Sequence, residues 1–185
     1  METEEPWSAG PFTEFIDKYV EEARAGDASQ EQVDALIASR ESGKIDVELV
    51  REAIAANAQC LEESGFTVSV SDGVKASGYV VPQYVAEHPS DLSTPQADAL
   101  FDACEKETSF WLSSAYQLQP EARNALGAYV TSREPQLREC LSENGYSPDL
   151  EATGWELAMQ ALEVLGEETD GNSVDCLSAS GIDGL

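Results

Sequence analysis

The sequence predicts a mainly α-helical domain that carries one small β-hairpin and is cross-linked by two disulfides. Apolar residues recur at helical spacing along most of the chain, the period shortens to two over 66–70, and four cysteines lie at wide intervals. A chain of 185 residues with 42% hydrophobic residues is long enough for one domain with a real core. We expect a flexible arm over 1–10 and a single helical domain over 11–185, with two degenerate halves at 11–118 and 119–185.

The first two expected helices combine an apolar face with local start and stop signals. The segment PFTEFIDKYVEEARAG has Pro11 in a first turn and Gly26 at the left-handed position that follows a helix. In the next segment, Ser29 and Gln32 can form a capping box, and Gly43 can end the helix. These signals predict two short amphipathic helices in succession.

A phrase of the form Cys-Leu-x-x-x-Gly-apolar occurs three times, at 60–66, 140–146 and 176–182. The helix that leads to the first copy can be capped by Asp46. In each copy the glycine can take the positive φ of a C-terminal cap, and the apolar residue after it can fold back on the last turn. The phrase therefore predicts three helix ends, each with a cysteine one turn inside.

The segment FTVSVSDGVKASGYVV alternates apolar and polar residues, which is typical of a half-buried strand. Asp72-Gly73 is a hairpin-turn signal, and residues 79–81 are the expected returning strand, which Pro82 would end. The stretch after Pro82, QYVAEHPSDLS, is expected to be a loop. An isolated hairpin is marginally stable, so we expect this one to pack on helices.

Later helices are expected to begin near proline residues, at Thr94-Pro95, Pro120 and Pro135. The sequence leaves open whether 94–118 forms one helix or two. A further helix in GWELAMQALEVLG is expected to present four apolar side chains, Trp155, Met159, Leu162 and Leu165.

Charge is the unusual feature of the composition. Ten Lys and Arg residues face thirty-six Asp and Glu residues, which gives a net charge of −26 and a pI near 4.1. Such a field repels nucleic acid and anionic membrane surfaces, so neither is an expected partner. The favoured interpretation is a soluble, salt-tolerant surface. A basic partner, diffuse cation binding and phosphate mimicry by an inhibitor are the alternatives.

The chain has four cysteines and a single histidine, His88, and these residues limit which metal sites and thiol reactions are possible. No closely spaced Cys or His pair suggests zinc, and a thiol nucleophile has no strong base nearby, so no metal or cofactor is expected. The even count favours two disulfides over free buried thiols. Three pairings are open, and we prefer Cys60–Cys104 with Cys140–Cys176.

Motifs for known chemistry do not occur in the chain: there is no Walker A, G-x-G-x-x-G, H-E-x-x-H or G-x-S-x-G sequence. Because thirty-six acids make some carboxylate pair look suggestive wherever they fall, we name no catalytic residue. Aromatic residues near the hairpin and its following loop are the candidate binding surface: Tyr79, Tyr84 and Trp111.

The stretch EARAGDASQEQVDALIASRESGKIDVELVREAIAANAQCLEESGFTV resembles a group of uncharacterised actinobacterial proteins that are secreted or anchored by an N-terminal lipid. The likeness lies in an Ala-Gly, Gln and Leu run, a second amphipathic helix and the Cys-Leu-x-x-x-Gly-aromatic ending, and it covers roughly residues 22–120. It implies a mature extracytoplasmic domain with paired cysteines. The sequence shows neither a signal peptide nor a lipobox.

These expectations together favour a non-enzymatic extracytoplasmic module of the cell envelope with a binding or structural role. Its partner would be an unknown protein or envelope component, and the resemblance implies a lipid as the anchor, if there is one. No stretch approaches the roughly 18 apolar residues of a membrane span, so no transmembrane segment is expected. Two alternatives remain: a secreted hydrolase that acts on envelope material through buried carboxylates, and an acidic protein-binding inhibitor. A native Met1 with free thiols would place the protein in the cytoplasm.

Overall fold

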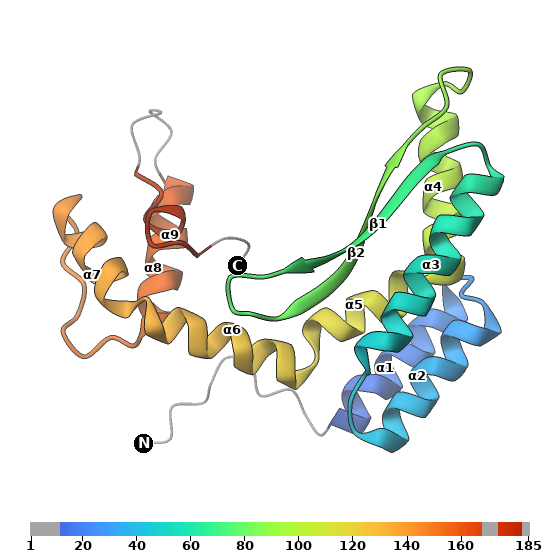
Figure 1. The fold of residues 1–185 in the computed structure, drawn as a ribbon. Coiled ribbons are helices and arrows are strands. Elements are labelled where there is room, and N and C mark those ends of the chain that lie inside the picture. The colour runs from blue at the N-terminus through green and yellow to red at the C-terminus, as the bar shows by residue number, and fades with distance from the viewer. Residues whose placement is uncertain (1–11, 168–173, 183–185) are drawn as a thin grey trace. The chain divides into compact units, whose positions relative to one another are not determined.

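The computed structural model describes residues 12–167 and 174–182, so the arm expected at 1–10 lies outside the described residues. Helices predominate, with one antiparallel hairpin and two disulfides, which confirms the expected fold class (Figure 1). In chain order the elements are α1 (Phe12–Ala25), α2 (Gln30–Ser42), α3 (Val47–Glu63), β1 (Thr67–Val74), β2 (Val80–Glu87), α4 (Thr94–Thr108), α5 (Phe110–Leu118), α6 (Pro120–Ser132), α7 (Glu134–Glu143), α8 (Gly154–Glu167) and α9 (Cys176–Ala179).

The chain divides into two compact units, and the boundary follows Arg123 inside α6. The first unit holds the described residues up to 123, except the hairpin turn at 75–79, which is grouped with the second unit. The second unit otherwise begins at Asn124. The idea that the two halves descend from a repeat stays a prediction.

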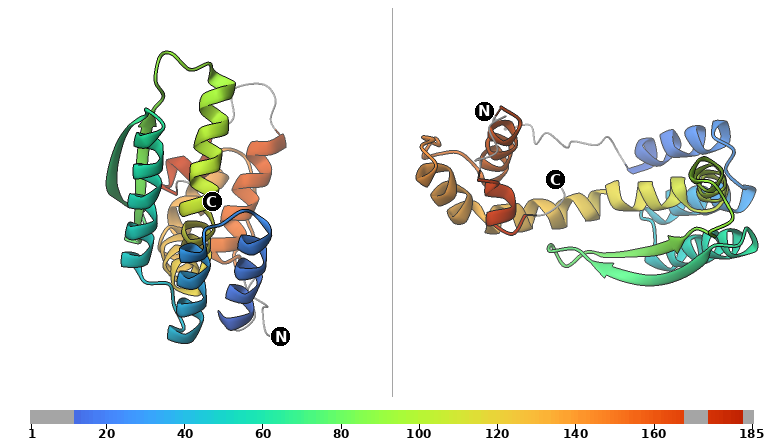
Figure 2. Two further views of the ribbon diagram at one scale, coloured as in Figure 1. Left: turned by 90° about the vertical axis from the view of Figure 1, so that its right-hand side faces the viewer. Right: turned by 90° about the horizontal axis from the view of Figure 1, so that it is seen from above.

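The core of the first unit forms where α3 packs against α4, α5 and both strands, while α1 packs against α2 and α5. The views in Figures 1 and 2 show α3 running beside the hairpin. Each fully buried aliphatic side chain contributes about 1.5–3 kcal/mol of transfer free energy, so this core supplies the main stabilisation of the unit. Its most buried aliphatic side chains are Ile16, Leu36, Ile45, Val50, Leu61 and Leu112.

The break between α4 and α5, which the sequence left open, is held by the buried side chain of Gln32 on α2. The Gln32 amide nitrogen donates to the carbonyl oxygens of Lys106 and Glu107, both at 3.0 Å. Its amide oxygen accepts from the backbone N–H groups of Trp111 and Leu112 at 2.7 and 3.1 Å. Helix ends leave such backbone groups without intrahelical partners, so one glutamine satisfies both ends of the break.

A second buried glutamine, Gln119, makes the same kind of link where α5 ends. Its amide oxygen accepts from the backbone N–H of Ile45 at 2.9 Å, and its amide nitrogen donates to the carbonyl of Ile45 at 3.2 Å. Ile45 lies in the short connection between α2 and α3 and is 2% exposed. The pair therefore ties a buried loop to the helix end, because buried backbone groups need partners.

All three copies of the Cys-Leu-x-x-x-Gly-apolar phrase end helices as expected. Gly65, Gly145 and Gly181 have φ values of 91°, 86° and 75°. In the first copy the N–H of Phe66 donates to the carbonyl of Leu61 at 3.0 Å, and the equivalent distances in the other copies are 3.0 and 2.9 Å. This is the Schellman arrangement, in which the residue after the glycine closes the last turn.

The end of α1 corrects one expectation. Asp27, not Gly26, takes the left-handed conformation, with φ 65°. Gly26 is required for another reason: a Cβ at this position would overlap the indole ring of Trp111. The end of α2 is as expected, because Gly43 has φ 78° and its N–H donates to the carbonyl of Ser39 at 3.0 Å.

The buried face of α8 differs in part from the one that the sequence suggested: Trp155 packs against the core as expected, but two of the other expected residues do not. Met159 and Leu162 are 46% and 41% exposed. A Cβ on Gly154 would press on the backbone of α6 at Val130. Small residues therefore permit close helix approach, and they outweigh the larger apolar side chains in deciding which face is buried. The buried core of the unit is Val130, Leu137, Leu141, Leu157, Ala158, Ala161, Cys176, Leu177 and Ile182.

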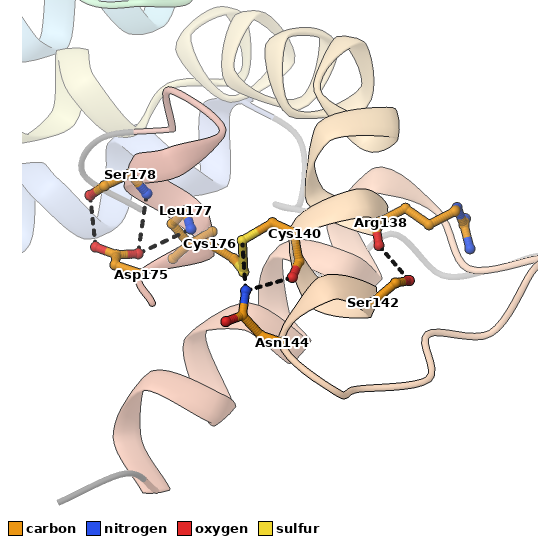
Figure 3. The surroundings of a disulfide bond; sticks show 8 residues. All are labelled: Arg138, Cys140, Ser142, Asn144, Asp175, Cys176, Leu177 and Ser178. Atoms are coloured by element: carbon orange, nitrogen blue, oxygen red, sulfur yellow. Dashed lines mark hydrogen bonds between the residues drawn. A yellow bond between two sulfur atoms is a disulfide. The ribbon is translucent and has the colours of Figure 1, made fainter. Parts of the chain in front are cut away.

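Both expected disulfide pairings are confirmed. Cys60 is bonded to Cys104, which joins α3 to α4, with Cα atoms 5.7 Å apart. Cys140 is bonded to Cys176, which joins α7 to α9, with Cα atoms 5.6 Å apart. In Figure 3 the side-chain amide of Asn144 donates to the carbonyl of Cys140 at 2.8 Å, beside the second bond. Each unit therefore carries one cross-link near a helix end.

Candidate functional site

The hairpin of the first unit is the element around which the candidate binding residues were expected, and it is longer than expected. Strands β1 and β2 pair in unbroken antiparallel register, from Thr67 opposite Glu87 to Val74 opposite Val80. The prediction of a hairpin turn at Asp72-Gly73 is therefore wrong, because Asp72 lies within β1. The prediction that the returning strand ends at Pro82 and is followed by a loop is wrong as well, because β2 continues to Glu87.

The chemistry of the turn and of a two-stranded sheet explains both errors. The turn lies at 75–79, where the N–H of Lys75 donates to the carbonyl of Tyr79 at 2.9 Å and Gly78 has φ 80°. Asp72 is extended and opposite Pro82, not in a turn. Proline is tolerated in edge strands, and both strands of a two-stranded sheet are edges, so Pro82 does not end β2.

Tyr84 fixes the hairpin to α4. Its hydroxyl donates to a carboxylate oxygen of Glu105 at 3.0 Å, and its ring lies 5.7 Å from the ring of Phe101, centroid to centroid. Burial of the hydroxyl and the negative charge of Glu105 raise the pKa of Tyr84 well above its ordinary value. Since Glu105 follows Cys104, the tyrosine and the disulfide hold the same turn of α4.

The side-chain amide of Asn57 on α3 lies close enough to the Tyr84 hydroxyl to lower the Tyr84 pKa, against the larger raising effects of burial and of the charge and hydrogen bond of Glu105. Asn57 is 0% exposed. Neither its amide nitrogen nor its amide oxygen makes a hydrogen bond of normal geometry with another described residue. The burial of this amide therefore costs stability, because its polar atoms lose water and gain no hydrogen bond of normal geometry in return.

Arg51 on α3 holds the middle of β1. Its guanidinium makes two hydrogen bonds to the carboxylate of Asp72, at 2.7 and 3.2 Å, and it also binds Glu48. The hydrogen bond from Arg51 holds the pKa of Asp72 below its usual range. One positive charge thus faces two negative charges at this place, and the local balance stays negative.

The three expected binding residues lie in different surroundings. Tyr84 is half-buried among the side chains of α3, α4 and the hairpin, while Tyr79 is half-buried at the end of the turn. Trp111 is half-buried on α5, packs its indole edge-on to the ring of Phe110 at 4.8 Å and covers Gly26. That they form a binding surface stays a prediction. Tyr84 and Trp111 also have structural roles.

The hairpin exposes apolar side chains that were not singled out from the sequence. Val70 and Val74 on β1 are 49% and 69% exposed, and Val85 on β2 is 65% exposed. The register places Val70 and Val74 on one face and Val85 on the other. The alternation in the sequence could have shown which face each valine occupies, but not where the supporting helices stop covering the strands.

The described residues show little of the side-chain grouping that metal or acid–base chemistry requires. Among the described residues, no three His, Cys, Asp or Glu side chains gather as a metal site would require. In the described ranges, three carboxyl groups have clearly shifted pKa values, and hydrogen bonds lower the pKa in each: Asp72, Glu156 and Asp175. Within the described part of the chain, no helix has the length and apolar character needed to cross a membrane.

Comparisons of the chain with protein-family models, curated protein sequences and solved structures gave no match. The resemblance to secreted or lipid-anchored actinobacterial proteins therefore stays a prediction.

Proposed function

We propose that the protein is a non-enzymatic module of the cell envelope that works outside the cytoplasm and binds a protein or envelope component. The observation that carries the proposal is the disulfide in each of the two compact units. Structural disulfides form and persist in oxidising compartments and are rare in the cytosol. The expected lipid anchor and the actinobacterial resemblance belong to this proposal and add a means of attachment.

A binding role agrees with how the first unit supports its hairpin. The strands are held from below by a disulfide-linked pair of helices, by the Tyr84–Glu105 hydrogen bond and by the Arg51–Asp72 ion pair. Rigid support of an exposed element lowers the entropy cost of binding, because less has to be ordered when a partner arrives. A hairpin on such a scaffold suits recognition of a partner.

The two alternative functions have less support. A hydrolase acting through a general-acid carboxyl group needs a raised carboxyl pKa, whereas the clearly shifted carboxyl groups of the described residues are lowered. A phosphate-mimicking inhibitor needs a dense acidic face, and no observation here favours one. The two cross-links fit a secreted hydrolase as well as a binding module, whereas they do not fit an inhibitor that works in the cytosol.

The proposal is tested on the protein in its native cells. One sample of cells is lysed in denaturant that contains an alkylating tag and no reductant, and a parallel sample is separated into extracytoplasmic and cytoplasmic fractions. We expect the protein in the extracytoplasmic fraction with no tagged cysteine, and four tags after reduction. Four tags without reduction, or a cytoplasmic protein, would overturn the proposal. Release of soluble fragments from purified envelope material would favour the hydrolase instead.

A further inference from the structure

We propose that the outer edge of β1 is a docking site for an extended, basic segment of a partner protein, which joins the hairpin as a third strand. The segment places apolar, basic and apolar side chains, at alternate positions, beside Val70, Asp72 and Val74. The inference rests on the binding role proposed above, because it specifies the chemistry of the partner.

The first support is an open strand edge. In a two-stranded sheet each strand has one edge without ladder hydrogen bonds, and such an edge is a template for another strand. On β2 that edge is partly used, because the hydroxyl of Tyr116 donates to the carbonyl of Val80 at 2.7 Å and Pro82 has no N–H. Among the described residues, the backbone groups of β1 that face away from β2 have no hydrogen-bond partner.

The second support is that β1 has little of the usual protection of an edge strand. Edge strands are normally blunted by charged side chains, above all lysine, by proline or by a bulge. The strand TVSVSDGV has one charged residue, Asp72, which is paired with Arg51; it contains neither lysine nor proline, and its eight residues pair with β2 without a bulge. Threonine and valine, which favour extended backbone, make up half of it. The edge is therefore continuous along the curved hairpin, and a partner strand that follows the same curve can pair with it (Figure 1).

The third support is the pattern of side chains on one face of β1. Val68, Val70, Asp72 and Val74 share this face, because alternate residues of a strand point the same way. Val68 packs into the cluster beneath the hairpin, whereas Val70 and Val74 stay largely exposed. A neighbouring strand would cover the open flanks of both valines. In the added strand, one residue lies beside Asp72. The residues two positions before and two positions after it lie beside the two valines and should be apolar.

The charge of the chain decides which partner fits. Asp72 shares Arg51 with Glu48, so the acidic residue in the middle of the edge is only partly balanced. The whole chain carries a net charge of −26. A second copy would bring the same charge and the same acid to the edge, and like charges in contact disfavour association. A lysine or arginine in the added strand meets Asp72 favourably.

The probe is a capped synthetic peptide, Thr-Val-Thr-Lys-Thr-Val-Thr, with a neutral fluorescent label, and the matched control peptide has glutamate in place of lysine. Binding to the oxidised full-length protein is followed by fluorescence anisotropy. We expect the lysine peptide to bind at least about tenfold more tightly than the glutamate peptide, because charge complementarity selects between them. Val70→Lys should weaken binding of the lysine peptide by at least about tenfold, since a like charge then stands at the edge.

Val85→Lys is the matched control variant, because it adds the same charge to the other strand and the opposite face. It should change the affinity by less than about twofold, since exposed charges more than a Debye length apart are largely screened. Val74→Lys provides a second edge variant at a more exposed position, and unchanged thermal unfolding by circular dichroism shows that each variant is folded. Amide hydrogen exchange should slow at alternate residues of β1 when the lysine peptide binds.

Four results would overturn the docking site: no binding of the lysine peptide, equal effects of Val70→Lys and Val85→Lys, exchange protection away from β1, or self-association of the chain that Val70→Lys abolishes. The last result would make a second copy the occupant. Failure here is separable from failure of the proposed function. If the lysine peptide does not bind and no cysteine is tagged, only the docking site is refuted. If all four thiols are free and the peptide still binds, only the proposed extracytoplasmic location is refuted.

Discussion

Replacement of Gln32 by methionine tests how the break between α4 and α5 is held. Methionine has nearly the length and volume of glutamine, so it fills the same space on α2 without making hydrogen bonds. The change removes four hydrogen bonds to backbone groups of the break. We expect Gln32→Met to destabilise the first unit because these groups have few other partners.

The expected size of the effect follows from which groups lose their partner. The carbonyl of Glu107 keeps a second hydrogen bond, from the N–H of Ser29 at 2.8 Å. The carbonyl of Lys106 lies on an exposed residue and can bind water. The N–H groups of Trp111 and Leu112 remain, and a buried unsatisfied group costs about 1–3 kcal/mol. One of these groups is only partly buried, so the total is about 2–4 kcal/mol.

Urea denaturation of the oxidised protein, followed by circular dichroism, measures the change in unfolding free energy. Gln30→Met is the matched control: it lies on the same helix, but Gln30 is exposed and its side chain bonds only to Asp34. The control should cost less than about 0.5 kcal/mol, as surface substitutions usually do. Amide exchange at Trp111 and Leu112 should accelerate in Gln32→Met alone. Equal stabilities of the two variants, with unchanged exchange, would refute the role of Gln32.

Three further outcomes follow from the second unit and from the hairpin support. Replacing Cys140 and Cys176 by serine should lower the unfolding free energy of the second unit by about 4 kcal/mol, because the cross-link closes a separation of 36 residues, and calorimetry of both forms checks this value. Asp175→Ala should cost about 1 kcal/mol at neutral pH through loss of the α9 cap, measured by urea denaturation. Because hydrogen bonding lowers the folded-state pKa of Asp175 below 3.8, the contribution of its charge is present above that value and disappears as the pH falls through the folded pKa. In a spectroscopic titration, Tyr84→Phe should remove a tyrosine that ionises well above pH 10.0. Because the folded-state pKa of Tyr84 is raised, its contribution to stability should be present below the unfolded-state pKa and should be lost as the pH rises through the folded-state pKa.

Helix ends were predictable because their causes lie within seven residues of sequence. A glycine after the last turn and the apolar residue that follows it determine the closing hydrogen bonds, which the carbonyls of Leu61, Leu141 and Leu177 accept. The same argument failed at Gly26 because its cause is distant: the indole of Trp111 occupies the space that a Cβ would take. The cysteine pairing was also accessible, since the even count and the helix-end phrases limit the alternatives.

Features that depend on tertiary packing were not accessible from the sequence. The Asp72-Gly73 pair has the composition of a hairpin turn, yet the helices beneath the strands favour a longer pairing that keeps Asp72 beside Arg51. The sequence placed Gln32 in a capping box with Ser29 and gave Gln119 no role, and only the fold shows that the side chain of each satisfies buried backbone groups. The exposed valines of β1 depend in the same way on where α3 stops covering the strand.

The cross-links and the charge act on the same balance of free energy. A net charge of −26 disfavours any compact state through mutual repulsion, and at an ionic strength near 0.1 M dissolved salt screens the repulsion between charges more than about 10 Å apart. A disulfide works through the unfolded chain, so its contribution does not depend on screening. Cys60–Cys104 ties together the two helices that support β1 and β2, next to Glu105 and its hydrogen bond to Tyr84. The hairpin edge thus stays presented at low salt, where attraction between the acidic chain and a basic segment is strongest.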